Sequence, residues 1–179
     1  DIRALRRGAQ VTLVTGPVSL TPPQGAQVEP VRTTEDLLQR MLALAPEQDI
    51  VIQAAAPADY RAQQIAPQKL KKQGDGALTL TFVPTPDVAK AVGEGKRDGQ
   101  ILVGFAAETE TAVENARKKL DSKHLDMIVA NDVTQPGAGF DVDTNIATII
   151  THQQAESLPI MTKKALADEI LTRALALRG

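Results

Sequence analysis

Three lysines within four residues are the first group in this sequence whose types and spacing could serve chemistry. Lys69, Lys71 and Lys72 lie in "QKLKK", between Pro67 and Gly74, and this pattern predicts a mobile flap with ammonium groups at its base. Ammonium groups placed in this way would bind the oxygens of a phosphate. The alternative is a solvated charge run on a loop, which is the commoner meaning of a short basic run.

A second pair of lysines suggests another anion site. Lys119 and Lys123 are four residues apart in a segment with helical periodicity, so they share one helix face. Like charges at this spacing destabilise a helix mildly unless an anion lies between them. Two surface lysines that splay apart into water would give the same spacing, so both interpretations stay open.

Polar and aromatic residues near the ends of apolar runs could hold a cation and a base. Asp59, Asn131 and Asp132 follow such runs, where a carboxylate could hold a hydrated Mg²⁺ shared with substrate phosphates. Asx residues also begin turns, which is an equally good explanation for each. Phe105 could present its ring to a nucleobase, although a phenylalanine within "ILVGF" is more often part of a core.

Composition excludes several other chemistries. The 179-residue chain has no cysteine, so disulfides, thiol nucleophiles and thiolate metal sites are ruled out, and two isolated histidines make a poor metal set. It contains no dinucleotide-binding glycine fingerprint and no P-loop, and neither Ser122 nor Ser157 lies in a nucleophile elbow. With 20 Lys and Arg against 22 Asp and Glu, and 2% aromatic residues, a nucleic-acid partner is not expected. No apolar run approaches the ~20 residues of a membrane span, so we expect a soluble protein of the reducing cytoplasm.

The elements that position these residues can be predicted from periodicity and turn signals. The expected strands are the apolar runs at 9–16, 26–32, 49–56, 101–108 and 126–132, the alternating run at 77–83, and two strands about a polar turn within 145–160. The expected helices are the last turns of one before Gly8, one at about 35–45, one within 84–96 with Thr85 as its N-cap, one within 109–124 and one within 161–178.

Strands that alternate with single helices favour a parallel sheet covered by helices on both faces. We therefore expect one α/β domain over 1–179, a Rossmann-like three-layer sandwich with a mostly parallel sheet, and a small β flap. In such sheets ligands bind beyond the carboxyl ends of the strands. Three of these ends carry unusual residues, in "AAAPADYR", "GFAAET" and "VAND". The residues alone thus predict an anion-binding α/β domain.

Seven segments taken together resemble phosphopantothenoylcysteine synthetases of coenzyme A biosynthesis. In chain order they are "RGAQVTLVTGPVSL", "AAAPADYR", "KLKK", "LVGFAAET", "ARKKLDSKHLDMIVANDV", "GFDVDTN" and "LPIMTKKALADEI". They run nearly from end to end, and the sharpest are "GFAAET" and the K-L-x-x-K-x-x-D-x-I-V-A-N-D run. The resemblance implies a ligase that uses CTP with Mg²⁺ or Mn²⁺ to activate 4'-phosphopantothenate as an acyl-cytidylate, which L-cysteine then attacks. It also implies a homodimer, in which the counterparts of the alternating segments "ALTLTFV" and "NIATIITHQQ", at 77–83 and 145–154, pair across a twofold axis.

The resemblance carries roles onto individual residues. Lys69 matches the catalytic flap lysine, and Asp59 matches a nucleotide or metal contact. Asn131 and Asp132 become substrate or cation candidates. The nucleotide contacts that it implies are Ala55, Asp59, Gly104, Phe105, Ala106, Lys119 and Lys123.

The sequence departs from the family pattern in ways that affect function. It has Pro57 where an aliphatic residue is usual, and Thr85, Pro86 and Asp87 where Asn-Pro-Asp is common. The family's first strand and a Gly/Ser-rich loop with a catalytic Asn precede the point where this sequence starts, so we expect an upstream segment. Bacterial members are often fused to a flavin-dependent decarboxylase, although nothing in these residues resembles a flavin site. The alternatives are a non-catalytic nucleotide-binding or assembly module and, less favoured, an NAD(P)-dependent oxidoreductase.

Overall fold

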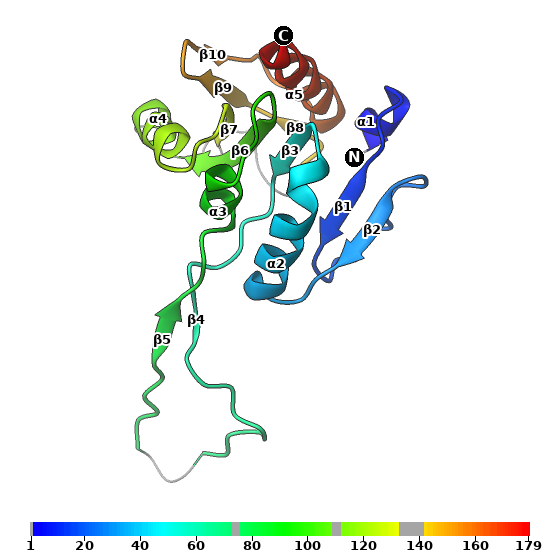
Figure 1. The fold of residues 1–179 in the computed structure, drawn as a ribbon. Coiled ribbons are helices and arrows are strands. Elements are labelled where there is room, and N and C mark those ends of the chain that lie inside the picture. Colours follow the sequence, from blue (N-terminus) through cyan, green and yellow to red (C-terminus); the bar gives the residue numbers. More distant parts are fainter. Residues whose placement is uncertain (1, 73–75, 109–111, 133–141) are drawn as a thin grey trace.

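Helices and strands alternate through most of the chain. The computed structural model describes residues 2–72, 76–108, 112–132 and 142–179 (Figure 1). Its helices are α1 (Ile2–Arg6), α2 (Thr34–Leu44), α3 (Val88–Glu94), α4 (Ala112–Ser122) and α5 (Lys163–Arg178), and a 3-10 turn, η1, covers Ala45–Glu47. Its strands are β1 (Thr12–Thr15), β2 (Gln27–Pro30), β3 (Ile50–Gln53), β4 (Tyr60–Ala62), β5 (Phe82–Pro84), β6 (Ile101–Glu108), β7 (Met127–Asp132), β8 (Thr144–Asn145), β9 (Ala147–Thr151), β10 (Ala155–Ser157) and β11 (Met161–Thr162). None of the helices in these ranges is long and apolar enough to cross a bilayer.

Five of the described strands form the main sheet, in the order β10-β9-β7-β6-β3. β3, β6 and β7 are parallel, whereas β9 and β10 extend the sheet as an antiparallel edge. The parallel strands are joined by α3 and α4, as expected for crossover connections. The α/β fold class predicted from the sequence is therefore confirmed.

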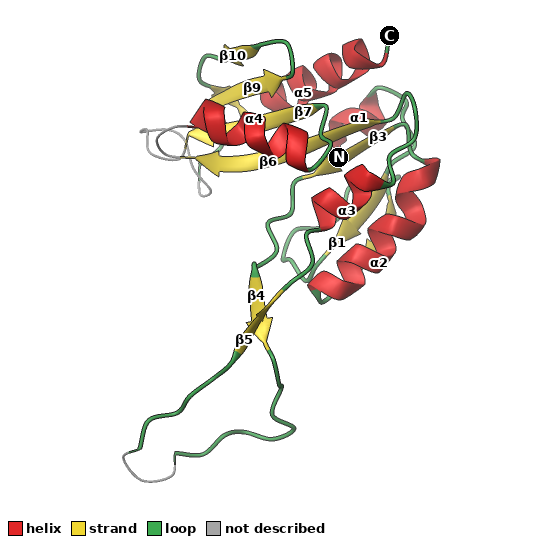
Figure 2. Ribbon diagram, turned by 60° about the vertical axis from the view of Figure 1, so that its left-hand side comes forward, coloured by secondary structure: helices red, strands yellow, loops and turns green. Residues whose placement is uncertain are grey.

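Helices cover both faces of this sheet (Figures 1 and 2). Side chains alternate along β6, so Leu102 and Ala106 join the core beneath α2, α3 and α4, whereas Ile101 and Val103 join the core beneath α5. Because both faces are covered, the strands are apolar throughout, which is the continuity seen in the sequence. Each cluster lies between the sheet and the helices on one face, which gives a three-layer arrangement with the sheet in the middle.

β1 and β2 pair in parallel as a separate two-stranded sheet near α1 and α2. α1 ends before Gly8, whose φ of 82° suits a residue without a side chain. Arg3 of α1 and Arg7, which directly follows α1, both bind the carboxylate of Asp168 on α5. These ion pairs fix the start of the chain against its last helix.

A long arm projects from the body between β3 and α3 (Figures 1 and 2). β4 and β5 form its base as an antiparallel pair. The arm corresponds to the flap predicted from "QKLKK". The alternating run at 77–83 was expected to be one strand, but only its end is a strand, because β5 covers Phe82–Pro84. Alternation in a short exposed segment is a weak signal without a neighbouring strand to complete its hydrogen bonds.

The predicted cap of α3 was also wrong by two residues. The N-cap is Asp87, whose side chain accepts a hydrogen bond from the Lys90 amide at 3.1 Å. Thr85 Oγ1 instead donates to the Ala58 carbonyl at 2.5 Å. Both residue types cap helices well, so sequence alone could not choose between them, and the pairing of Thr85 with residues 58 and 59 decides it.

Candidate functional site

The carboxyl ends of β3, β6 and β7 meet at one edge of the sheet because these strands are parallel. Gln53 lies opposite Gly104, and Ala106 lies opposite Ala130 in the registers of the three strands. Ala55 follows β3, and its carbonyl accepts a hydrogen bond from the buried Gln53 side chain at 3.4 Å. Ala55, Ala106, Asn131 and Asp132 therefore lie along the edge at which ligands bind in such folds.

The base of the arm places Asp59 beside the start of α3. The Thr85 amide donates to the Asp59 carbonyl at 2.9 Å, and Thr85 Oγ1 binds the neighbouring Ala58 carbonyl. The Asp59 side chain is exposed. The Asp59 backbone is thus held next to the residues that lead into α3.

Asp87 and Lys123 form an ion pair at the start of α3. Lys123 Nζ lies 2.9 Å from Asp87 Oδ2, and the two side chains are 30% and 42% exposed. Burial acts to raise the pKa of Asp87, but the Lys90 amide hydrogen bond and the Lys123 ammonium outweigh it and hold that pKa below its usual value. Asp59 and Lys123, predicted independently, are therefore gathered by residues 85–87.

Close packing between α3 and α4 fixes the position of Lys123. A Cβ added to Gly93 would lie 2.0 Å from the Lys123 carbonyl oxygen, so only glycine permits this approach. Lys119 lies one turn earlier on α4 and is half-buried. Lys123 directly follows the end of α4 at Ser122, and its charge is neutralised by Asp87.

The three candidate residues of β6 do not form one group. Gly104 packs closely, since an added Cβ would lie 2.8 Å from Leu125 Cδ1. Gly104 and Ala106 point toward the α3 and α4 side, whereas Phe105 packs against the α5 cluster on the opposite face. The strand's alternation thus separates the Phe105 side chain from Lys119 and Lys123.

Lys69 lies in the segment between β4 and β5, which forms the arm that projects from the body (Figure 1). Lys69, Lys71 and Lys72 are exposed. The structure therefore does not bring Lys69 to the other candidate residues in the described arrangement. Any role for Lys69 at the strand ends requires the arm to move or to reach another copy of the chain.

Asn145 is a site residue that the sequence reasoning did not single out. It is 8% exposed, and its Nδ2 group donates to Asn131 Oδ1 at 2.9 Å. Asn145 Oδ1 accepts from the Ile146 amide at 3.0 Å. The signal available in the sequence was a polar residue directly before the apolar run "IATII".

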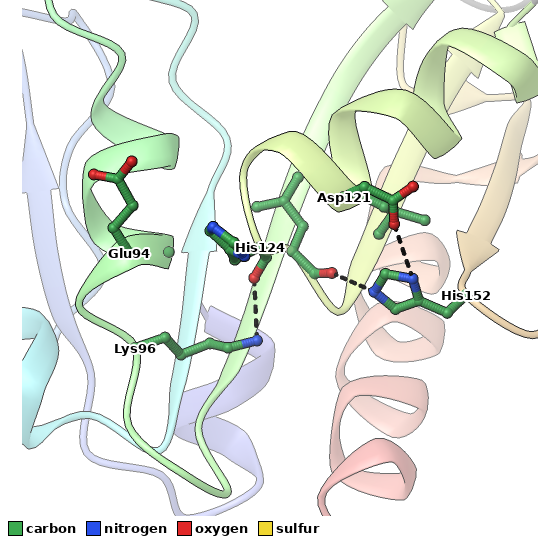
Figure 3. Close-up of a pocket in the computed structure, with 8 residues that line it drawn as sticks. Glu94, Lys96, Asp121, His124 and His152 are labelled. Atoms are coloured by element: carbon green, nitrogen blue, oxygen red, sulfur yellow. Dashed lines mark hydrogen bonds and ion pairs between the residues drawn. The ribbon is translucent and has the colours of Figure 1, made fainter.

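A cavity of about 480 Å³ opens at the other end of the sheet, beside the end of α4 (Figure 3). His152 bridges two of its walls, with Nδ1 3.4 Å from Asp121 Oδ1 and Nε2 3.1 Å from the Leu125 carbonyl. His124 has a φ of 53°, which ends α4 in a left-handed conformation. Within the described ranges, no three His, Cys, Asp or Glu side chains are grouped to hold a metal ion.

The fold and the strand-end residues define a Rossmann-like α/β domain with a candidate anion site. A family model for the C-terminal domain of DNA/pantothenate metabolism flavoproteins matches residues 2–177. The chain belongs to this family.

Relatives and solved structures agree with this assignment. The chain is 47% identical to the coenzyme A biosynthesis bifunctional protein CoaBC of Bacillus subtilis, over 97% of the chain and 43% of that protein. It is 45% identical to CoaBC of Escherichia coli K12, over 95% of the chain and 43% of that protein. The crystal structure of a CoaBC C-terminal domain superposes with a TM-score of 0.79 at 38% identity, covering 98% of this chain and 79% of that one. The chain thus spans less than half the length of these curated relatives.

Proposed function

We propose that the protein containing this chain ligates cysteine to 4'-phosphopantothenate with CTP, giving phosphopantothenoylcysteine, CMP and pyrophosphate. The observation that carries the proposal is the 45–47% identity to bifunctional coenzyme A biosynthesis proteins over nearly the whole chain. The gathering of Asp59, Asp87 and Lys123 at the start of α3 is compatible with a site for a charged nucleotide.

The proposed chemistry requires charge neutralisation at two steps. In the first step the phosphopantothenate carboxylate attacks the α-phosphorus of CTP, and pyrophosphate leaves. In the second step the cysteine amine attacks the acyl carbon, CMP leaves, and the amine loses its proton. Both steps place negative charge on phosphoryl or acyl oxygens, where a positioned ammonium such as that of Lys69 stabilises it. An arm that closes over the mixed anhydride would also exclude water.

The residues present fit a magnesium ion that is shared with the nucleotide. Asp59 supplies an exposed carboxylate at a strand end, and Mg²⁺ is commonly held by one or two carboxylates together with substrate phosphates. When bound, the ion would neutralise phosphate charge. The remaining nucleotide contacts in this proposal are Ala55, Gly104, Phe105, Ala106, Lys119 and Lys123, with Asn131 and Asp132 near the acyl group.

The proposed assembly is a homodimer in the cytoplasm, where CTP and cysteine are available. The arm exposes several large apolar side chains, which suits contact with a second copy. The relatives are named bifunctional, so we propose that residues 1–179 form one ligase domain and that the protein containing them also carries a decarboxylase half.

The test is pyrophosphate release by the complete protein with CTP, phosphopantothenate and cysteine. We expect release that depends on both CTP and phosphopantothenate, and tighter binding of CTP than of ATP by calorimetry. A site built to pair with the cytosine edge leaves buried polar groups unsatisfied with the wrong base. Equal affinities would remove the nucleotide preference alone, whereas CTP binding without pyrophosphate release would favour a non-catalytic binding module.

A further inference from the structure

The hydrogen bonds around Asn145 determine which way the Asn131 side chain is oriented. A backbone N–H can only donate, so the atom of Asn145 that faces the Ile146 amide at 3.0 Å is its oxygen. The other branch of the same carboxamide is therefore the NH₂ group. This group lies 2.9 Å from Asn131, so the Asn131 atom that it meets is an oxygen.

The same reasoning continues through Asn131. Its oxygen is already used as an acceptor for Asn145, and the Nδ2 group occupies the other branch of the planar carboxamide. Asn131 lies near the carboxyl end of β7, opposite Ala147 of β9 and Ala107 of β6. Among the described residues, the branch of Asn131 that Asn145 does not use is thus the donor, while its oxygen already spends one of two lone pairs on Asn145.

Asn145 is well placed to hold this orientation. It is 8% exposed, so its amide is shielded from competing water. β8 pairs with β11, and Thr162 at the end of β11 caps α5 by accepting from the Ala165 amide at 3.2 Å. The Asn145 backbone is therefore fixed by a strand pair that leads directly into a sixteen-residue helix.

We propose that Asn145 is a positioning residue that makes Asn131 a hydrogen-bond donor to an oxygen of the bound substrate, and not a cation ligand. The oxygen belongs either to CTP or to phosphopantothenate, and the shared chemistry is an anionic or carbonyl acceptor. This inference rests on the proposed function for the identity of the two ligands. The orientation of the amide pair itself does not depend on that function.

The orientation is tested first without any ligand, by a double-mutant cycle on the melting temperature of the complete protein. In Asn131→Asp the new carboxylate still accepts from Asn145. In Asn145→Asp the Asn131 amide can turn over and donate. The double variant faces two acceptors of like charge, so we expect its melting temperature to fall by at least about 4 °C more than the sum of the single changes. Additive shifts would overturn the pairing, whether or not the protein is a ligase.

Calorimetry with CTP alone and with phosphopantothenate alone then identifies the ligand. Asn131→Asp replaces the outward donor by an acceptor, so the affinity for the ligand that supplies the oxygen should fall about 10- to 100-fold. Asn145→Asp should lower the affinity for the same ligand, although Asn131 itself is unchanged. A purely structural role for Asn145 would not produce that loss. If Asn145→Asp does not fold, Asn145→Ser, which keeps a donor, should bind more tightly than Asn131→Asp.

The control for the added charge is Gln153→Glu, in the exposed turn between β9 and β10 at the other end of the sheet, which should leave both affinities unchanged.

A Mg²⁺ titration in the presence of CTP tests the opposite role, in which Asn131 would be a cation ligand. If Asn131 were a cation ligand, Asn131→Asp would raise the Mg²⁺ affinity, and that result would overturn the proposal. Unchanged affinity of both single variants for both ligands would overturn it as well. A wild-type protein that binds ligand but releases no pyrophosphate would count against the proposed ligase function alone.

Discussion

At the scale of single residues, a substitution of Lys69 can distinguish a catalytic role from a structural one, because the side chain is exposed on the arm. We expect Lys69→Ala to change the free energy of unfolding by no more than about 0.5 kcal/mol, as is usual for exposed positions. Turnover should fall on the order of 10²-fold or more, because one electrostatic donor to developing charge is lost. CTP affinity should fall much less. The measurements are pyrophosphate release by the complete protein and a melting curve.

The neighbouring Lys71→Ala variant is the control for this prediction. Lys72 is not used as the control, because residues 69–72 do not form a strand and strand alternation therefore does not place Lys72 on the face opposite Lys69. Equal losses of turnover in Lys69→Ala and Lys71→Ala would mean that the basic charge of the arm matters and not one ammonium group. Unchanged turnover in Lys69→Ala would return these lysines to a solvated loop.

Gly93 is a second residue whose effect can be predicted from one contact. Alanine is a better helix former than glycine, so Gly93→Ala in an open helix would stabilise the protein. Here the added Cβ would lie 2.0 Å from the backbone oxygen of Lys123, and backbone cannot rotate away. We expect a loss of about 1–3 kcal/mol of stability from this overpacking, measured by denaturant unfolding. At Gly95 the nearest atom would be 3.8 Å away, so Gly95→Ala serves as the control and should stay within about 0.5 kcal/mol.

At the scale of elements, the start of α3 depends on Asp87 in two separable ways. Asparagine caps a helix as well as aspartate does, but it cannot pair with the Lys123 ammonium. Asp87→Ala should therefore cost about 1 kcal/mol at neutral pH, whereas Asp87→Asn should cost only the part due to charge, which solvent screening keeps small. Thermal unfolding of the two variants beside the wild type measures both.

The contribution of the Asp87 charge to the stability of the fold has a defined pH dependence. Since the pKa of Asp87 is lowered from 3.8 in the folded protein, its ionised form stabilises the fold above that ordinary value. This contribution is lost as the pH falls through the lowered pKa. The stability difference between wild type and Asp87→Asn should shrink as the pH falls below 3.8, and a difference that stays constant throughout this acidic range would show that it does not come from the Asp87 charge.

The elements differ in how far the sequence could predict them. α2 was predicted within a residue or two because Thr33 and Asp36 form a complete capping box. β5 was predicted too long, since the pairing that limits it comes from Tyr60–Ala62, a segment more than twenty residues earlier. The strand ends were predicted from apolar continuity, but the Asn145–Asn131 contact depends on the register of β7 with β9 and on β8 beside it. Short-range periodicity does not contain that information.

At the scale of the whole molecule, the arm is the feature that a single copy of the chain leaves most exposed. Its large apolar side chains are Tyr60, Ile65, Leu70, Leu78, Leu80 and Phe82, which are between 53% and 91% exposed. The outer edges of β4 and β5 also offer backbone groups to another strand. Monomeric proteins rarely leave so many large apolar side chains of one segment open to water, and a second copy with the same arm is self-complementary about a twofold axis.

We therefore predict that the 179-residue chain is a dimer held by the arm. Light scattering at micromolar concentration should give twice the 19.1 kDa mass of one chain. The double variant Leu80→Glu with Phe82→Glu should give the mass of one chain, because it places like charges in the centre of the paired surface. The fold of the single chain should survive both substitutions, as a far-UV circular dichroism spectrum like that of the wild type would show, since both side chains are more than half exposed. The matched control is Leu20→Glu, which alters a leucine that is 79% exposed in the loop after β1 and should remain dimeric. A monomeric wild-type chain, or a dimer that survives the double variant, would contradict the assignment, and Lys69 would then have to reach the strand ends by closure of the arm within its own chain.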